Sequence, residues 1–349
     1  MAYSTIKDPS AHFQTAIYTG NGDSADDTNA IVNDGNSDLQ PDFIWLKRRD
    51  YDNGYQLIDS IRGVTKLIGS ETNATETTLS GRLASFDTDG FTVQSSSGAF
   101  NAQNEPFVAW QWKANGGTTS SNTDGDVTST VQVNSDAGFS IITDGTHANT
   151  NARTIGHGLG KTPTFIIRRA RNRVENWRLL FNGFGTTGAI NLDSEGTYNS
   201  STTLFTGVTS TTFGVGTDFS VNGAYNYITY CFTDVQGYSK SGSYKGNGNV
   251  NGPFVYTGFK PAWIIIKANS NYKYWNIYDN KRDSYNSAKK RLAPSLPDAE
   301  DTADGIDFLS NGFKIRNSGT TLNESGTTIA YMAFAENPFV AGGVPTTAR

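Results

Sequence analysis

The chain has 349 residues, a length that suggests two or three domains. Charged residues make up 17% of it and hydrophobic residues 36%, which provides enough apolar material for a core and excludes disorder of the low-hydrophobicity kind. The net charge of −5 argues against a general nucleic-acid binder and against electrostatic docking on an anionic membrane surface.

The single cysteine, Cys231, excludes an internal disulfide and a cysteine-based zinc site. The sequence has no apolar run long enough for a transmembrane helix, and residues 1–22 lack the apolar stretch of a signal peptide. We therefore expect a protein that is made in the cytoplasm and does not insert into a membrane.

Short aromatic and β-branched runs between clusters of Gly, Asn and Asp predict an all-β protein with a helix content under about 15%. The run Phe43 to Leu46 is apolar at successive positions, which predicts a strand covered on both faces. Near Trp177 and Trp275 the pattern alternates, so one face of each following strand should be buried. Two segments, Ser60 to Ile68 and Asn286 to Leu292, are predicted as short helices.

Four blocks recur three times in the same order. Each repeat opens with a proline, one variable residue, an aromatic and an isoleucine-led run that ends in a base: Pro41 to Lys47, Pro163 to Arg169 and Pro261 to Lys267. Fourteen residues after each proline lies an aromatic: Tyr55, Trp177 and Trp275. Alternating runs follow from Phe91, Phe219 and Phe313, and then aromatic strands from Val108, Ile228 and Ile329.

A unit of about 95 residues is long enough to close its own core. We therefore predict three tandem antiparallel β-sandwich modules of the jelly-roll or concanavalin-like kind. Module 1 with an N-terminal segment spans 1–112, a linker 113–138, module 2 139–232, a short linker 233–243, and module 3 with a C-terminal tail 244–349. The strand-like run Val127 to Val133 within the first linker is expected to pair with a neighbour. The modules fit either a threefold ring or a rod.

Several segments carry a resemblance to a known group: Met1 to Ser10, Tyr18 to Gly22, Asn33 to Asp42, Phe107 to Asn115 and Gly156 to Pro163. They resemble proteins common in marine bacteriophages, and the resemblance covers almost the whole chain. It implies a virion structural protein, either tail-fibre-like or on the capsid surface, with lectin-like β-sandwich modules. It supplies no catalytic residues.

A charged pair recurs in modules 1 and 3, an aspartate 18 residues after the proline and an arginine three residues later: Asp59 with Arg62, and Asp279 with Arg282. Module 2 has Phe181 and Phe184 at these positions. We interpret the pair as a structural ion pair that marks where two modules touch, with a binding site as the alternative. An adjacent arginine keeps a carboxylate ionised, which opposes a role as general acid.

A base ends the first strand of every module: Lys47, Arg169 and Lys267. Three equivalent bases suit recognition of a phosphate or an acidic sugar. The simpler interpretation is that they solubilise the end of the strand.

Signals for catalysis and metal binding are weak. The three histidines, His12, His147 and His157, lack metal-ligand spacing, and His157 between two glycines is predicted to be a conformational or capping residue. No Gly-x-Ser-x-Gly elbow is present. The runs Asn21 to Asp27 and Asn122 to Asp126 offer oxygen ligands for calcium, although neither matches an EF-hand loop. We predict no catalytic residue and no cofactor, with calcium as the one alternative.

The preferred hypothesis is a non-enzymatic virion component, a tail-fibre or host-attachment protein, because Tyr, Trp, Asn, Ser and Gly in turns suit adaptable surface contacts. The expected partners are other virion proteins, further copies of the chain and a host surface glycan, but not nucleic acid. Two alternatives stay open, a capsid decoration protein that binds the coat shell and a glycan-degrading tail enzyme, because a fold alone does not separate these functions.

Overall fold

A computed structural model describes residues 4–24, 26–94, 97–147, 149–270, 272–338, 340–341 and 344–345. Strands make up 45% of the protein and helices 2%, so the all-β prediction is confirmed. The first three residues of the phage-like opening, position 25 in the first calcium candidate and residues 346–349 of the predicted tail lie outside the described residues.

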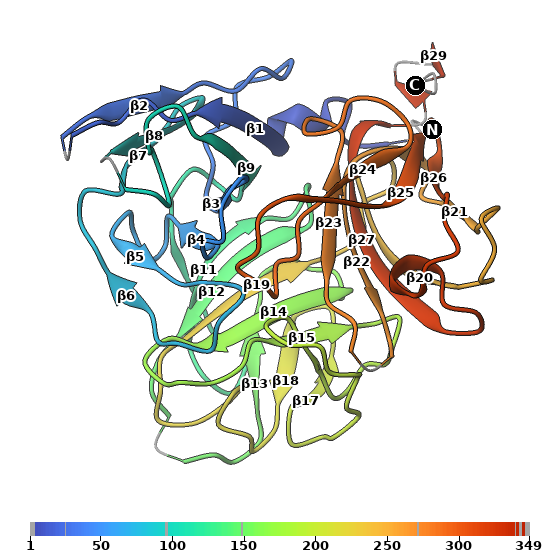
Figure 1. The fold of residues 1–349 in the computed structure, drawn as a ribbon. Coiled ribbons are helices and arrows are strands. Elements are labelled where there is room, and N and C mark those ends of the chain that lie inside the picture. Colours follow the sequence, from blue (N-terminus) through green and yellow to red (C-terminus); the bar gives the residue numbers. More distant parts are fainter. Residues whose placement is uncertain are drawn as a thin grey trace.

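Three antiparallel sheets contain the same four-stranded order, and we call them the inner sheets (Figure 1). The first inner sheet has the spatial order β1 (Phe13–Thr19), β9 (Pro106–Trp112), β3 (Phe43–Arg48) and β4 (Gln56–Asp59). The second has the order β12 (Phe139–Asp144), β19 (Tyr227–Phe232), β14 (Phe165–Ala170) and β15 (Arg178–Phe181). The third has the order β20 (Ser239–Lys245), β27 (Thr328–Pro338), β22 (Phe259–Ala268) and β23 (Asn276–Asp279). The second inner sheet is extended at its edges by β10 (Ser120–Asn122), β11 (Ser129–Asn134) and β16 (Ile190–Asn191).

Each inner sheet packs against an outer sheet, and an apolar core lies between the two. The outer strands are β2 (Thr28–Ile31), β8 (Gly90–Gln94) and β7 (Leu83–Asp87); β13 (Arg153–Gly156), β18 (Thr212–Val215) and β17 (Phe205–Val208); and β21 (Phe254–Tyr256), β26 (Gly312–Ile315), β25 (Asp301–Leu309) and β24 (Ala288–Arg291). We call the resulting units the first (13–112), second (120–232) and third (239–338) sheet pairs. The closer comparison with jelly-roll or concanavalin-like folds stays a prediction.

The predicted repeat has the same register in every inner sheet. The aromatic two positions after each repeat proline lies opposite the last aromatic of the partner strand: Phe43 opposite Trp112, Phe165 opposite Phe232, and Trp263 opposite Phe334. Tyr55, Trp177 and Trp275 are buried and each directly precedes the second strand of its repeat. These parts of the alignment are confirmed.

The third block of the alignment is wrong in the second repeat. Phe219 lies in a turn and is 46% exposed. The strand that corresponds to β8 and β26 is β18, which carries the buried Phe213 fifty residues after Pro163. Pro41 and Pro163 precede their strands, whereas Pro261 lies inside β22 at a register shift.

Both predicted helices are wrong. The segment Asn286 to Leu292 contains β24, which pairs with β25, and Ser60 to Ile68 forms turns and β5 (Lys66–Leu67), which pairs with β6 (Thr77–Thr78). The helices of the described residues are η1 (Pro9–Ala11) and α1 (Thr320–Asn323), and β28 (Val340–Ala341) pairs with β29 (Val344–Pro345).

The predicted linkers are strands in part. Residues 113–138 contain β10 and β11, which pair with the second inner sheet, as expected for the run Val127 to Val133. Residues 233–243 contain the start of β20. Polar composition therefore marks edge strands here rather than free connections.

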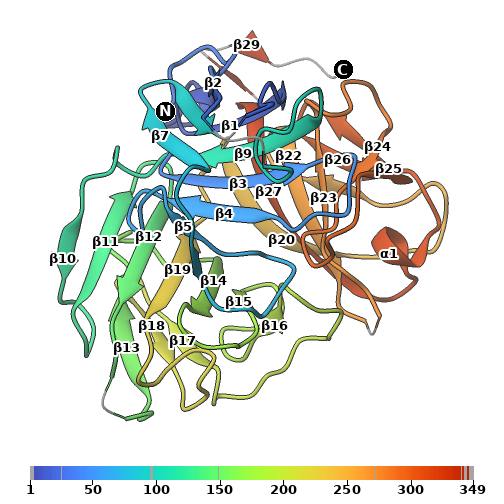
Figure 2. The ribbon, with the colours of Figure 1, turned by 60° about the vertical axis from the view of Figure 1, so that its left-hand side comes forward.

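A fourth apolar core joins the three sheet pairs. Phe43 and Trp45 face this shared core, whereas Ile44 and Leu46 face the first outer sheet, so the strand is covered on both faces as predicted. Figure 2 shows the three sheet pairs as sectors around a common centre, blue to cyan, green to yellow, and orange to red. The chain forms a ring, not a rod.

Three equivalent aromatics meet at the centre of this ring. The ring centroids of Trp112, Phe232 and Phe334 lie 5.6 to 6.2 Å apart, in tilted edge-to-face contacts. Aromatic rings favour this geometry over face-to-face stacking. The pseudo-threefold axis of the molecule therefore runs through a packed aromatic cluster and leaves no channel between these three rings.

Candidate functional site

The predicted pair Asp59 and Arg62 lies at the boundary between the first and second sheet pairs. Both side chains are fully buried, and Arg62 Nε lies 2.6 Å from Asp59 Oδ2. Tyr230, from the second sheet pair, donates its hydroxyl to the same carboxylate oxygen at 2.7 Å. Glu76 binds the far side of the guanidinium at 3.0 Å. Burial acts to lower the pKa of Arg62, but Asp59, Tyr230 and Glu76 have the larger combined effect and raise this pKa.

The pair Asp279 and Arg282 repeats this geometry between the third and first sheet pairs. Arg282 Nε lies 2.5 Å from Asp279 Oδ2, and Glu300 accepts from the same guanidinium at 2.9 Å. Trp110, from the first sheet pair, donates its indole N–H to Asp279 at 3.0 Å. Trp110 occupies the same register position as Tyr230, so the two boundaries are built alike.

The third boundary is apolar at this point. Phe181 takes the position of the aspartates, and Met332 takes the position of Tyr230. Both side chains lie in the shared core, against which the half-buried Phe184 also packs. The prediction that the charged pair marks where modules touch is confirmed. At the boundary between the second and third sheet pairs the charged pair is absent, because Phe181 replaces the aspartate and Met332 replaces the residue that would bind it.

Two more ion pairs extend these boundaries. Arg171 binds Glu76 at 2.8 Å, and Arg49 binds Glu300 at 2.7 Å. Each arginine lies eight residues after its repeat proline, so this spacing is visible in the sequence. The glutamates follow their arginines Arg62 and Arg282 at unequal distances in the sequence, so no spacing reveals them.

The three predicted bases are buried, and they bind backbone carbonyls. Lys47 donates to the carbonyl oxygens of Tyr51 at 2.9 Å and of Pro297, in the third sheet pair, at 2.9 Å. Arg169 donates to Thr72 and Ala74 of the first sheet pair.

The third base, Lys267, donates to the carbonyl of Lys273 in its own sheet pair at 2.6 Å. Burial lowers the pKa of Lys47 and of Lys267 to about 8. The interpretation of these bases as solubilising residues is therefore wrong, and the structure gives them no face toward a phosphate or an acidic sugar.

His157 and the second calcium candidate have structural partners within the protein. His157 is buried, and its Nδ1 accepts from the amide of Leu159 at 3.2 Å, as expected for a capping residue. In the second calcium candidate, Asn122 accepts from the amide of Asp124 and Asp126 accepts from Thr154. Within the described ranges, no three His, Cys, Asp or Glu side chains cluster as metal ligands do.

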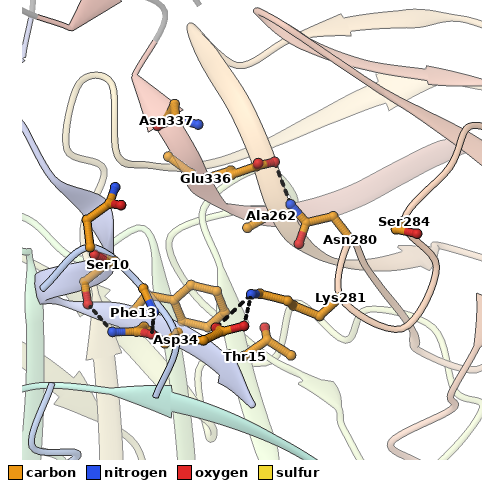
Figure 3. Close-up of a pocket in the computed structure, with 14 residues that line it drawn as sticks. Ser10, Phe13, Thr15, Asp34, Ala262, Asn280, Lys281, Ser284, Glu336 and Asn337 are labelled. Atoms are coloured by element: carbon orange, nitrogen blue, oxygen red, sulfur yellow. Dashed lines mark hydrogen bonds and ion pairs between the residues drawn. The ribbon is translucent and has the colours of Figure 1, made fainter. Parts of the chain in front are cut away.

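A cleft of about 360 Å³ opens between the first and third sheet pairs (Figure 3). One wall comes from η1, β1 and the loop that contains Asp34, and the other from β22, β27 and the turn after β23. Its lining is mostly amide, hydroxyl and carboxyl groups with a few apolar side chains: Ser10, Phe13, Gln14, Thr15, Asp34, Gly35, Asn36, Ala262, Asn280, Lys281, Ser284, Ala335, Glu336 and Asn337.

The charges of the cleft are paired across or beside it. Lys281 of the third sheet pair lies 2.7 Å from Asp34 of the first, and Asn280 donates to Glu336 at 2.5 Å (Figure 3). Gln14 fixes the loop of the first wall, because its carbonyl oxygen accepts from the amide of Gly35 at 2.9 Å. Sequence reasoning missed this cleft, since its two walls lie more than 200 residues apart.

The fold defines a class of all-β proteins in which antiparallel sheets pack in layers around a shared core. Residues 8–338 match the family described as Domain of unknown function (DUF7483), and the chain belongs to this family. No curated protein matches the chain. In the part of the chain that the structure describes, none of the helices is long and apolar enough to span a bilayer.

Proposed function

We propose that this protein is a non-enzymatic structural component of a phage particle, a tail-fibre or host-attachment component that binds a surface glycan or partner virion proteins. The observation that carries the proposal is the shared core, which joins three sheet pairs into one body and leaves the connecting loops and the cleft at the surface. Recognition sites are typically built on loops held by such a rigid scaffold.

The placement of the acids supports a role without catalysis. A general acid or nucleophile must come within hydrogen-bond distance of its substrate. Asp59 and Asp279, the acids that recur in the sequence repeats, are fully buried and bound to arginines. The acids of the cleft, Asp34 and Glu336, are held by Lys281 and Asn280.

One observation favours a second candidate, a capsid decoration protein. Phe254 and Tyr256 point outward from β21, an edge strand of the third outer sheet, and each is about half exposed. Apolar side chains on an exposed edge strand are typical of protein contacts. Further copies of this chain or a coat protein are the partners that such an edge would suit.

Imaging of phage particles that carry a tagged copy of this protein tests the proposal. Signal at the tail supports an attachment component, and signal over the head supports the decoration protein instead. Absence from purified particles contradicts both. The purified wild-type protein should also bind host cells without releasing reducing sugar from their polysaccharide, and release of sugar would replace the proposal with a glycan-degrading enzyme.

A further inference from the structure

The pseudo-threefold symmetry allows the cleft to be compared with the same place at the other two boundaries. Thr15 on β1 corresponds to Ile141 on β12 and to Ser241 on β20, because each lies opposite the same position of the partner strand. Ala262, on the facing wall, is the residue directly after a repeat proline, as are Asp42 and Thr164.

At the other two boundaries, protein groups fill this place and bind one another. Between the first and second sheet pairs, Ser60 donates its hydroxyl to Asp42 and lies 2.7 Å from the side-chain oxygen of Gln132. Between the second and third, Thr164 donates to Asp234 at 2.9 Å and to Ser241 at 3.3 Å. Both boundaries are therefore closed by hydrogen bonds between side chains.

The boundary between the first and third sheet pairs lacks these partners. Ala262 has no polar side-chain group. Thr15 is only 5% exposed, and its hydroxyl is buried without a hydrogen-bond partner. A buried hydroxyl without a partner loses its hydrogen bonds to water without replacing them, so native proteins rarely keep one without a reason. Thr15 is one of the residues that line the cleft, at a position where the second sheet pair has an isoleucine (Figure 3).

The lining selects the chemical class of the ligand. Lys281 is neutralised by Asp34, so the cleft offers no unpaired cation to a phosphate. Asn36 and Asn337 bring side-chain amides, which both donate and accept, and Ala335 and Ala262 add small apolar surface. Paired donors and acceptors beside small apolar patches suit adjacent hydroxyl groups on an aliphatic ring.

We propose that the cleft between the first and third sheet pairs binds one or two units of a neutral saccharide, with the Thr15 hydroxyl as an interior hydrogen-bonding group. This inference rests on the proposed attachment function, because it assigns the glycan site of that function. It also goes beyond that function, since it names a single site that the other two boundaries cannot provide.

The test is titration of the full chain with neutral disaccharides. We would measure binding of lactose, maltose, cellobiose and N,N′-diacetylchitobiose by saturation-transfer NMR and calorimetry, up to about 10 mM. Thr15→Ile should weaken binding about tenfold or more, because it removes the interior hydroxyl and copies the residue of the second sheet pair. Asn36→Trp should also weaken binding about tenfold or more, because the indole would fill part of the cleft. Asn36 is exposed at the rim, so this substitution should not disturb the core. Thr130→Ile, the same substitution on the exposed face of β11, is the matched control and should bind like wild type.

Each outcome is decisive. Loss of binding in both cleft variants, with the control unchanged, supports the site. Binding that both folded cleft variants retain, or no binding of any of the four sugars by wild type, overturns it. Host-cell binding separates this result from the proposed function: cells bound equally by wild type and Asn36→Trp would leave an attachment role intact while removing the cleft from it.

Discussion

At the scale of single residues, the buried acids are tolerable because each of their oxygens is bonded. Asp279 Oδ2 accepts from Arg282 and Trp110, and Oδ1 accepts from the backbone amides of Lys281 and Arg282. A buried carboxylate with fewer partners would be strongly destabilising in a low-dielectric interior. The pair therefore serves to position two sheet pairs rather than to perform chemistry.

Removing one partner of this pair should be costly. We expect Asp279→Asn to lower the free energy of unfolding by about 3–5 kcal/mol, because it leaves the Arg282 charge buried beside a neutral amide. Urea denaturation followed by tryptophan fluorescence measures the change.

A partly exposed ion pair away from the boundaries supplies the control. Asp307 lies 3.1 Å from Arg316, whose side chain is about half exposed. Asp307→Asn should change the free energy of unfolding by at most about 1 kcal/mol. Equal losses in Asp279→Asn and Asp307→Asn would show that burial at the boundary adds nothing to the first pair.

Trp275 tests the packing of the shared core. It is fully buried, and its indole N–H donates to the carbonyl of Asn191 in the second sheet pair at 2.9 Å. Trp275→Ala should cost about 3–5 kcal/mol as a large-to-small core substitution. Tyr272→Ala, at an exposed loop position three residues earlier, should stay within about 0.5 kcal/mol. A folded Trp275→Ala variant that loses under about 1 kcal/mol would contradict the core assignment.

At the scale of elements, repeat spacing predicts the parts of the fold that recur. The offset of fourteen residues from the proline places Tyr55, Trp177 and Trp275 correctly because the two strands it connects form one hairpin in every repeat. The longer offset fails at Phe219, because the outer-sheet connections differ in length and a similar alternating run in a turn competes with the true strand at Phe213.

Helix propensity predicts the wrong secondary structure where pairing with a neighbouring strand determines it. Ala288 to Arg291 contains good helix formers, but β25 supplies hydrogen-bond partners that turn the segment into an edge strand. The charged pairs were predictable since both partners lie within four residues of one another. Thr15 was not, because a lone threonine in a strand has no sequence signal, and its missing partner becomes visible only beside Ile141 and Ser241.

The loop after β16 carries a testable pH dependence. Asp193 Oδ2 accepts from the amide of Trp177 at 3.2 Å, whereas Oδ1 is buried without a hydrogen-bond partner. Burial raises the pKa of Asp193 to about 6, although the Trp177 amide and Arg169 act to lower it. An acid whose pKa is raised on folding stabilises the protein fully below its unfolded pKa near 4, and this contribution is lost as the pH rises through about 6.

Asp193→Asn should therefore stabilise the protein in a pH-dependent way. The amide keeps an acceptor for Trp177 and carries no charge, so the free energy of unfolding should rise by about 1–3 kcal/mol at neutral pH and stay nearly unchanged near pH 4. Denaturant titrations of wild type and variant across this range measure the difference. A difference that does not vary with pH would mean that the carboxyl group is not the origin of the effect.

At the scale of the whole molecule, the shared core makes the three sheet pairs depend on one another. Every inner sheet has two apolar faces, and only one of them is covered by its own outer sheet. Trp112, Phe232 and Phe334 come from three different sheet pairs and meet at the axis. Separation of one sheet pair would expose the face that carries these rings to water, which opposes independent folding.

The full chain should unfold in one cooperative transition, with fluorescence and circular dichroism curves that coincide. Residues 118–238 expressed alone should instead bind a hydrophobic dye and lack a sharp transition, because Phe139, Phe165 and Phe232 lose their cover. Trp112→Ala should lower the midpoint of the whole transition without splitting it, since its ring contacts both other sheet pairs. Three separable transitions, or a cooperative isolated segment, would show that each sheet pair is a domain in its own right and that the shared core is only a contact surface.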